Sequence, residues 1–194
     1  VGYTAISDSY SSGAVSGVSN QIGGFVGFNG PDPQTTRQMC GFACPWGSQK
    51  DTISNSYSTG LVSSTGRQYV GSFVGYNYGI IGNSYWNSET SNQSLAGVGG
   101  GSLTGATGLT TAQMQTQASF TGWDFANTWR IYEGQSYPVL QALQTNLTIT
   151  ANDAVKTYDG QGYAGGNGAT YSVAGVSLDN QLTYGGSSQG AVNA

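Results

Sequence analysis

The chain has 194 residues, of which only 7% are charged, and its net charge is −4. An average soluble protein has about 25% charged residues, and the five Lys and Arg residues never cluster, so the sequence argues against a nucleic-acid partner. The 32 glycines follow no three-residue period, which excludes collagen, and the 13 Tyr, 6 Phe and 4 Trp residues argue against disorder. A β-rich fold that buries aromatic side chains and exposes neutral polar ones accounts for this composition.

Neither a membrane-spanning segment nor a signal peptide is recognisable in the chain. No apolar run approaches the roughly 20 residues that a membrane-spanning helix needs, so we expect no membrane insertion. The chain opens with VGYTAISDSY and closes with SSQGAVNA, each in mid-pattern. We therefore expect it to be a segment of a longer protein.

A short block of residues occurs three times in the first half of the chain. It reads ISDSYSSG at Ile6–Gly13, ISNSYSTG at Ile53–Gly60 and IGNSYWNS at Ile81–Ser88. A second block reads GGFVGFNG at Gly23–Gly30 and GSFVGYNYG at Gly71–Gly79. The second and third copies of the first block lie 28 positions apart, which sets the length of the repeating unit.

This repeat predicts an array of stacked β-strands. A period of 20 to 50 residues is typical of solenoids and related arrays. Val, Ile, Tyr and Phe alternate with polar residues over short runs that end at Gly or Asn, and no 3.6-residue apolar stripe is present. We therefore predict an all-β fold that begins, over residues 1–108, with a short right-handed β-solenoid (β-helix). Each coil would hold three short strands.

Stacked coils must present the same side chains to each other, because one coil cannot bury its own face. The predicted ladders of stacked side chains, facing inward, are Ile6–Ile53–Ile81, Tyr10–Tyr57–Tyr85 and Phe25–Phe73. Positions at tight corners, where the left-handed backbone geometry is needed or tolerated, are predicted at Gly27, Gly75, Asn29 and Asn77. The low charge fits this arrangement, since like charges along a ladder repel.

These residues resemble a known family. GGFVGFN (Gly23–Asn29) and GSFVGYNYGIIGNSYW (Gly71–Trp86) resemble the GLUG repeat of large bacterial surface proteins, namely filamentous-haemagglutinin-like adhesins and related secreted proteases. Leu109–Leu143 resembles the segment that commonly follows these repeats. Leu147–Gly166 resembles the start of a YDG-type repeat, a β-sandwich-like stalk module of the same adhesins. The resemblance covers most of the chain and implies no particular ligand.

The segment after the repeats combines a Gly- and Ser-rich stretch, a helix candidate and many aromatic residues. Residues 91–108 predict a loose coil edge or a loop. In TTAQMQTQASF, Thr110 can cap a helix and Gln113 can complete a capping box. The dense set that follows is Trp123, Phe125, Trp129, Ile131, Tyr137, Val139 and Leu140. We predict that residues 109–144 cap the open end of the solenoid, with an aromatic sugar-binding platform as the alternative.

The pattern changes near Gln144, where we place a domain boundary. Leu147 and Ile149 are expected to face inward, with Thr148 and Thr150 facing outward. An Asp-Gly pair at residues 159–160 predicts a turn. Residues 145–194 are fewer than the resembling module needs, so they predict a partial β-sandwich-like module.

The insert Pro31–Lys50, which lengthens the spacing between the first two copies, holds both cysteines. A zinc site lacks ligands, because the chain has no His and no second Cys pair. We predict a local disulfide between Cys40 and Cys44, with two free buried thiols as the alternative.

The same insert is the predicted ligand contact. Insertions in solenoids map to loops, often on the binding face. The candidate contacts are Arg37, Phe42 and Trp46. The alternative is a loop that packs on its own coil.

We find no convincing catalytic motif. The absence of His excludes Ser-His-Asp and Cys-His devices. Asp32 and Asp51 flank the insert and form the one plausible acid pair for polysaccharide chemistry, although both also suit turns. Calcium-binding repeats are missing, so no catalytic residue, metal or cofactor is expected. Asn92 and Asn146 begin N-x-[ST] acceptor sequences for glycosylation.

The sequence therefore predicts a non-catalytic structural and adhesive segment of a large secreted or surface-anchored bacterial adhesin. It would provide reach and display the insert for contact with host or matrix glycans or proteins, or between cells in a biofilm. The alternatives are a polysaccharide-acting β-helix enzyme, a surface-templating module such as an ice binder, and a self-associating module that stacks end to end into fibres.

Overall fold

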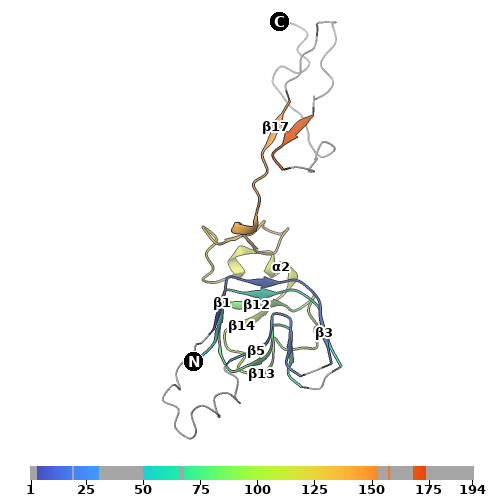
Figure 1. The fold of residues 1–194 in the computed structure, drawn as a ribbon, viewed down its shortest axis with the longest axis vertical. Coiled ribbons are helices and arrows are strands. Elements are labelled where there is room, and N and C mark those ends of the chain that lie inside the picture. Colours follow the sequence, from blue (N-terminus) through green and yellow to red (C-terminus); the bar gives the residue numbers. More distant parts are fainter. Residues whose placement is uncertain are drawn as a thin grey trace. The chain divides into compact units, whose positions relative to one another are not determined.

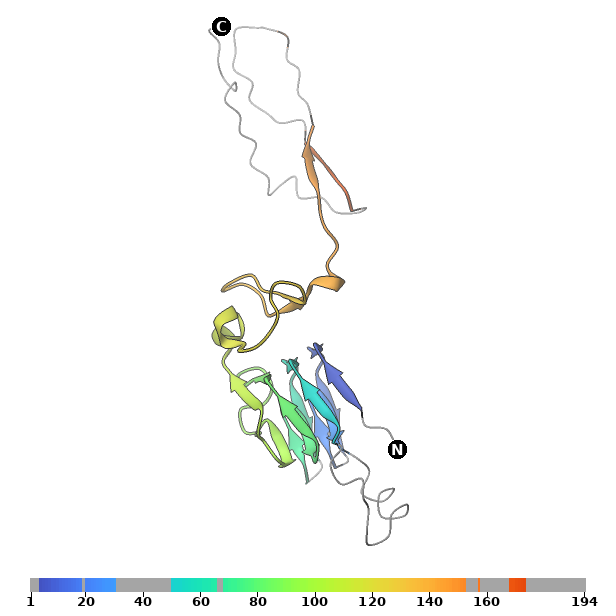
Figure 2. The ribbon, with the colours of Figure 1, turned by 90° about the vertical axis from the view of Figure 1, so that its left-hand side faces the viewer.

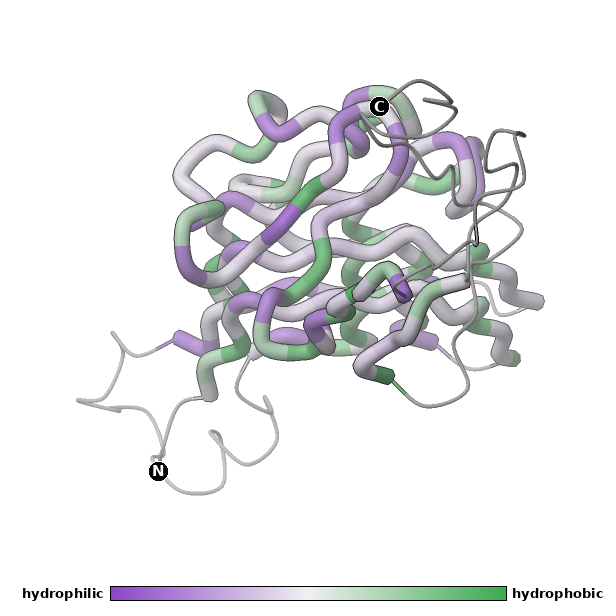
Figure 3. The backbone as a smooth tube through the Cα atoms, turned by 90° about the horizontal axis from the view of Figure 1, so that it is seen from above, coloured by the Kyte–Doolittle hydropathy of each residue, from purple (hydrophilic) through white to green (hydrophobic). Residues whose placement is uncertain are grey.

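The computed structural model describes residues 4–18, 20–30, 50–65, 68–152, 157 and 168–173. The chain divides into two compact units, Val1–Leu143 and Gln144–Ala194. The described part is built from short strands with very little helix, which agrees with the predicted all-β class (Figure 1). Its backbone is coloured mostly pale in Figure 3, because Gly, Ser, Thr and Tyr are neither strongly apolar nor strongly polar.

The first unit contains three successive layers of strands. The first layer holds β1 (Ala5–Ser7), β2 (Tyr10–Ser11), β3 (Val15–Gly17), β4 (Ile22–Gly23) and β5 (Val26–Asn29). The second holds β6 (Thr52–Ser54), β7 (Tyr57–Ser58), β8 (Val62–Ser64), β9 (Val70–Gly71) and β10 (Val74–Asn77). The third holds β11 (Ile80–Gly82), β12 (Ser84–Asn87) and β13 (Val98–Gly101), and β14 (Ala106–Leu109) follows it. The first two layers thus have five strands each, where three were expected.

Equivalent strands of successive layers pair in parallel, as the neighbouring arrows in Figure 2 show. The sheets run in the orders β1-β6-β11, β14-β12-β7-β2, β3-β8, β4-β9 and β13-β10-β5. The register places Ile6 beside Ile53 and Ile53 beside Ile81. It likewise places Tyr57 between Tyr10 and Tyr85. The predicted pairing of both ladders is therefore confirmed, although the tyrosine ladder does not face inward as predicted.

An apolar core lies between the sheets of the stack. Its buried members are Ile53, Phe73, Val74, Ile81 and Val98. The Phe25 and Phe73 rings are stacked 5.1 Å apart, which confirms the third ladder. Trp86 packs against this core from β12, at the position that Ser58 occupies one layer earlier.

The recurring serines of the first block join the layers by hydrogen bonds. The hydroxyl groups of Ser9, Ser56 and Ser84 each donate to the carbonyl oxygen two residues earlier. The backbone N–H of Ser9 donates to Ser56 Oγ at 3.3 Å, and the N–H of Ser56 donates to Ser84 Oγ at 3.3 Å. The repeated serine is therefore a structural residue.

The left-handed backbone positions differ from those predicted. Positive φ angles occur at the variable position of the first block, with 47° at Asp8, 46° at Asn55 and 43° at Asn83. Asn and Asp adopt this geometry more readily than other non-glycine residues. The prediction for Gly27, Gly75, Asn29 and Asn77 was wrong, since none of the four has a positive φ.

Those four residues have other structural roles. A Cβ atom at Gly27 would lie 2.7 Å from the Gln21 carbonyl oxygen, and one at Gly75 would lie 2.6 Å from the Gln21 carbonyl carbon. The glycines are thus required by close backbone approach. Asn29 and Asn77 are buried, and Asn29 Nδ2 donates to Asn77 Oδ1 at 2.7 Å.

The Gly- and Ser-rich stretch 91–108 is also more regular than predicted. It contains β13 and most of β14, which extend two of the parallel sheets. A Cβ atom at Gly108 would lie 2.8 Å from Trp86 Cζ2, and one at Gly97 would overlap the same ring. These glycines make room for Trp86, while Val98 of β13 and Leu109 of β14 contribute buried side chains to the core.

The segment that follows, residues 110–143, begins with α2 (Thr111–Met114). Gln113 N–H donates to Thr110 Oγ1 at 3.2 Å, and Thr110 N–H donates to Gln113 Oε1 at 2.9 Å. The predicted capping box is therefore confirmed. The segment continues through 3-10 turns η1 (Gln117–Ser119) and η2 (Gln141–Leu143) and an antiparallel pair, β15 (Trp129–Arg130) with β16 (Val139–Leu140).

This segment covers one face of a sheet rather than the end of the stack, which corrects the predicted cap. Trp129 contacts both Tyr10 and Tyr57, and Trp123 contacts both Tyr57 and Tyr85. These contacts span three neighbouring strands. Successive side chains of a strand face opposite sides, and Ser11 Oγ donates into the stack to the Gly24 carbonyl. The tyrosine ladder therefore faces outward, toward the covering segment.

The covering segment is fixed to this face by hydrogen bonds as well as by rings. Tyr57 OH donates to the Pro138 carbonyl at 2.6 Å, and Trp123 Nε1 donates to the Asn83 carbonyl at 2.8 Å. Burial raises the pKa of Tyr57, with further contributions from Tyr10 and Tyr137. The hydroxyl group thus stays protonated and remains a donor.

In the second unit, β17 (Ile149–Ala151) pairs antiparallel with β18 (Ala169–Tyr171). Leu147 is 39% exposed and Ile149 41% exposed, so the predicted inward packing of these residues is wrong. A two-stranded ribbon has no second layer of its own against which to bury one face. The predicted turn at residues 159–160 lies outside the described residues.

Candidate functional site

The residues that the sequence singled out for ligand contact fall outside the part of the chain that the structure describes. These are Arg37, Phe42 and Trp46, together with the predicted disulfide partners Cys40 and Cys44. Their roles remain predictions.

The acid pair weighed for polysaccharide chemistry is only half described. Asp32 lies outside the described residues. Asp51 precedes β6, and its Oδ1 atom accepts a hydrogen bond from the backbone N–H of Thr4 at 2.6 Å. Thr4 precedes β1, so Asp51 links the starts of the first two layers.

The other described carboxylates also accept hydrogen bonds within the fold. Asp8 accepts from Asn55 Nδ2, and Glu133 accepts from Gln117 N–H. Hydrogen bonds from Thr111 lower the pKa of Glu89, and its backbone N–H contributes more than its side chain. The side chain of Asn127, followed by its backbone N–H, lowers the pKa of Asp124. Each of these carboxylates accepts hydrogen bonds that fix a loop or a strand end.

Among the described residues, no group of three or more His, Cys, Asp or Glu side chains lies close enough together to hold a metal ion. The aromatic residues of the covering segment offer no sugar-binding platform at their core, because Phe120, Trp123 and Trp129 are 3%, 7% and 0% exposed. These rings are packed against the tyrosine ladder.

A different set of aromatic side chains reaches the surface. We call it the surface aromatic cluster, and it consists of Phe28, Tyr69, Tyr76 and Tyr78. Phe28 and Tyr76 are paired in register on β5 and β10, with ring centroids 6.3 Å apart. The Tyr69 ring meets Tyr76 edge-on at 4.5 Å, and the Tyr78 ring lies 4.8 Å from Tyr76.

Local backbone geometry positions this cluster. Tyr69 has a φ of 58°, and Gln21, which occupies the corresponding place in the first layer, has a φ of 64°. The chain therefore forces a left-handed residue here, which is uncommon for a bulky side chain. A Cβ atom at Gly100 would lie 2.5 Å from Tyr69 Cδ1 and 2.6 Å from Tyr76 Cδ2, so glycine leaves room for both rings.

The cluster combines apolar ring faces with hydroxyl groups. Tyr69 and Tyr78 are 38% and 50% exposed. A hydrogen bond with the Tyr78 side chain, followed by desolvation, raises the pKa of Tyr76. The Tyr76 hydroxyl group therefore stays uncharged at neutral pH. Such a surface can stack on an apolar ligand face while its hydroxyl groups form hydrogen bonds.

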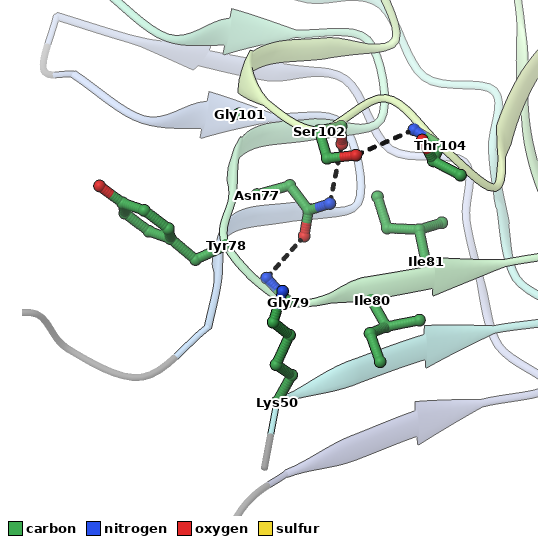
Figure 4. A pocket seen from close by; sticks show the side chains of 9 residues that line it. All are labelled: Lys50, Asn77, Tyr78, Gly79, Ile80, Ile81, Gly101, Ser102 and Thr104. Atoms are coloured by element: carbon green, nitrogen blue, oxygen red, sulfur yellow. Dashed lines mark hydrogen bonds between the residues drawn. The ribbon is translucent and has the colours of Figure 1, made fainter. Parts of the chain in front are cut away.

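An open depression of about 500 Å³ lies beside the cluster (Figure 4). It is lined by Lys50, Asn77, Tyr78, Gly79, Ile80, Ile81, Gly101, Ser102 and Thr104. Ile80 is 52% exposed, and the Lys50 side chain extends toward Gly79. Asn77 Nδ2 donates to the Ser102 carbonyl at 2.8 Å, and Asn77 Oδ1 accepts from Gly79 N–H at 3.1 Å. The Asn77 side-chain amide thus holds Gly79 and Ser102 of the lining in place. Lys50 is the one cationic residue among the lining residues.

Sequence reasoning missed this surface although a signal was present. The position between Gly and Asn in the second block is aromatic in both copies, as Phe28 and Tyr76. Tyr69 lies outside the repeated blocks, and only the structure brings it to Tyr76.

Comparison with known proteins gives limited information. No family model matches the chain, and no solved structure matches it. A curated relative, described as a putative Gly-rich membrane protein of Evansella cellulosilytica, is 32% identical over 108 residues. The match covers 52% of this chain and 12% of that protein, so the chain spans only a small part of its relative's length. None of the described helices here is long and apolar enough to cross a membrane.

Proposed function

We propose that this chain is a non-catalytic structural and adhesive segment of a large bacterial surface protein. In this proposal the parallel stack is a short right-handed β-solenoid of the GLUG type, and the second unit begins a YDG-type module. The regular ladders support the solenoid, because the repeated Ile, Ser, Tyr and Asn side chains are all used in packing one layer on the next. The name of the longer relative, a membrane protein, supports a location at the cell surface.

The observation that carries the proposal is the surface aromatic cluster beside a depression that has no acid pair. The described carboxylates hold loops and strand ends, so nothing in the described part suggests proton transfer to a substrate. Exposed aromatic rings that carry hydroxyl groups suit the apolar faces and hydroxyl groups of a glycan. Host or matrix glycans are therefore the proposed ligand class, and the insert Pro31–Lys50 is the proposed second contact.

Glycan-array and cell-binding assays on the whole chain test this proposal. Tyr69→Gly is the sharpest variant, because glycine relieves the positive φ while it removes the ring. We expect a roughly two- to thirteenfold loss of affinity, since an aromatic contact is worth about 0.5–1.5 kcal/mol. Tyr132→Ala removes a still more exposed ring from the covering segment and should bind like the wild type.

A version with Pro31–Lys50 replaced by a short turn separates the two contacts. Loss of binding only in this version would assign recognition to the insert instead of the cluster. Equal binding by the wild type, Tyr69→Gly and the insert replacement would overturn both assignments. Failure of the wild-type chain to bind any glycan or cell would make the segment a spacer.

A further inference from the structure

The last strand of the first layer ends in a chemically labile pair of residues. Asn29 closes β5, and Gly30 follows it. An asparagine that precedes glycine deamidates more readily than other asparagines, because no glycine side chain hinders attack of the backbone nitrogen on the amide carbon. Asn77 takes the equivalent place in the second layer, but the bulky Tyr78 follows it. The two paired asparagines therefore differ in intrinsic lability. A further Asn-Gly pair, at 167–168, begins outside the described residues.

The fold requires both residues of this labile pair. Asn29 Nδ2 donates to Asn77 Oδ1 at 2.7 Å and reaches the Ile80 carbonyl at 3.5 Å. Gly30 has a φ of 143°, which side chains disfavour, and a Cβ atom there would lie 2.6 Å from Tyr78 Cβ. A less labile residue at either position would disturb the packing of the first layer on the second.

The folded stack holds both reacting groups in place. Asn29 is only 5% exposed, and its side-chain amide is bound to the second layer. Its carbonyl oxygen accepts hydrogen bonds from Tyr78 N–H at 2.7 Å and from Gly79 N–H at 3.0 Å. These bonds fix the plane of the peptide group that contains the Gly30 nitrogen. Ring closure needs the side chain and this peptide group to rotate toward each other, which breaks their hydrogen bonds to the second layer.

We propose that Asn29 is a site of spontaneous deamidation that the stack controls, so that the reaction records each opening of the first layer. Once the layers separate, the Gly30 nitrogen bonds to Asn29 Cγ, the Cγ–Nδ2 bond breaks, and ammonia leaves with the proton of the Gly30 N–H. Water then opens the succinimide ring to aspartate or isoaspartate. No electrons are transferred, and water is the only co-reactant.

The product no longer fits the stack. A carboxylate at position 29 faces Asn77 Oδ1 and the Ile80 carbonyl, which are both acceptors. Asn77 cannot turn its amide to donate instead, because its two polar atoms bind Gly79 N–H and the Ser102 carbonyl. The first layer is thus left with a buried charge that lacks a donor, and it does not return to its register.

The modification also disturbs the surface aromatic cluster. Phe28 directly precedes Asn29, and its ring lies 6.3 Å from that of Tyr76. In isoaspartate the main chain runs through Cβ and Cγ, so the carbonyl that accepts from Tyr78 N–H becomes a free carboxylate. An effect on ligand binding rests on the proposed function, whereas the reaction itself does not.

Peptide mass spectrometry of the whole chain tests the proposal, after incubation at mildly alkaline pH in buffer alone and in guanidinium chloride. In the unfolded chain, Asn29 should deamidate several-fold faster than Asn77, which is the control within the same sample. Asn29 should react at least about tenfold more slowly in the folded chain, because reaction then requires local opening. Equal folded and unfolded rates at Asn29 would overturn control by the stack. Equal rates at Asn29 and Asn77 in the unfolded chain would overturn the labile site.

Two substitutions test how the stack exerts this control. Asn77→Ala removes the acceptor at 2.7 Å and should speed deamidation of Asn29 several-fold in buffer, relative to Gln93→Ala at an exposed amide. Asn29→Asp mimics the product and should lower the melting temperature, whereas Gln93→Glu adds the same charge at the exposed position and should not. The proposal fails if Asn77→Ala reacts no faster than Gln93→Ala, or if Asn29→Asp melts like Gln93→Glu.

Discussion

The side-chain amide of Asn29 donates a hydrogen bond to Asn77 Oδ1 at 2.7 Å, and this bond joins the first two layers inside the stack. Asn77 in turn joins the second layer to the third, because its Nδ2 atom donates a hydrogen bond to the carbonyl of Ser102, the residue that follows β13, at 2.8 Å. Both asparagines are nearly inaccessible to water. A buried polar group must be paired, so this ladder makes the correct stacking register more favourable than a shifted one.

Replacing Asn77 by alanine should therefore destabilise the stack. The change removes the hydrogen bond to the Ser102 carbonyl and one of two acceptors each for Asn29 Nδ2 and Gly79 N–H, which also donate to the carbonyls of Ile80 and Asn29. We expect a loss of about 1–3 kcal/mol in the free energy of unfolding. Urea unfolding followed by tyrosine and tryptophan fluorescence measures this loss. Gln93→Ala, at an exposed amide, is the control and should change stability by less than about 0.5 kcal/mol. An Asn77→Ala variant as stable as this control would show that the ladder is dispensable.

Gly97 and Trp86 form a steric pair that predicts a conditional effect. Gly97→Ala should cost about 1–3 kcal/mol, because its Cβ would overlap the Trp86 ring. In a Trp86→Ser background, where the serine of the first two layers is restored, the same change should cost much less. A double-mutant cycle by thermal unfolding measures this coupling.

Gly13→Ala is the control for that cycle, because a Cβ there meets nothing within 4 Å and Gly13 has no positive φ. It should be neutral or slightly stabilising. Equal costs for Gly97→Ala in both backgrounds would contradict the steric account.

Asn55 tests the left-handed positions of the first block. Asn55→Gly should leave stability nearly unchanged, since glycine accepts the φ of 46° and the bond to Asp8 is long at 3.4 Å. Asn55→Val should cost about 1–3 kcal/mol, because a β-branched residue is strained there. The melting temperatures of the two variants check this, and the idea fails if valine is tolerated as well as glycine.

Asp124 predicts an acid-sensitive contribution to stability. Its pKa in the folded state lies below the ordinary value of 3.8, chiefly through the side chain of Asn127. A group whose pKa is lowered by folding stabilises the protein fully above its unfolded pKa and loses that effect as the pH falls through the folded pKa. The melting temperature of the wild type should therefore drop below about pH 4, and Asp124→Asn should show a smaller drop. Identical pH profiles for the two proteins would rule out this role.

The ladders could be predicted from the sequence because they are made of identical residues. Ile6, Ile53 and Ile81 occupy the same position in the three copies of the first block. Stacked layers favour the same residue at such a position, because each layer packs against the next. The helix cap at Thr110 could also be predicted from the sequence, because a capping box needs only two suitable residues at a fixed spacing.

Other features could not be predicted because no side-chain pattern marks them. In β13, Gly100 and Gly101 pair with Tyr76 and Asn77 through the backbone, so the strand leaves no alternation in the sequence. The covering segment was expected at the end of the stack, but the outward tyrosine ladder places it on a face. The position of the covering segment depends on which side of the two-residue strands β2 and β7 faces away from the apolar core. A strand of two residues is too short for its sequence pattern to show this.

The most direct test of the account is to measure binding and cleavage together. The whole chain is incubated with a panel of host, matrix and bacterial polysaccharides, and both bound protein and newly released reducing ends are determined. We predict binding of at least one polysaccharide, weakened by Tyr69→Gly, with no reducing ends above the protein-free control. Release of reducing ends that scales with protein concentration would contradict the account and show that the segment is an enzyme.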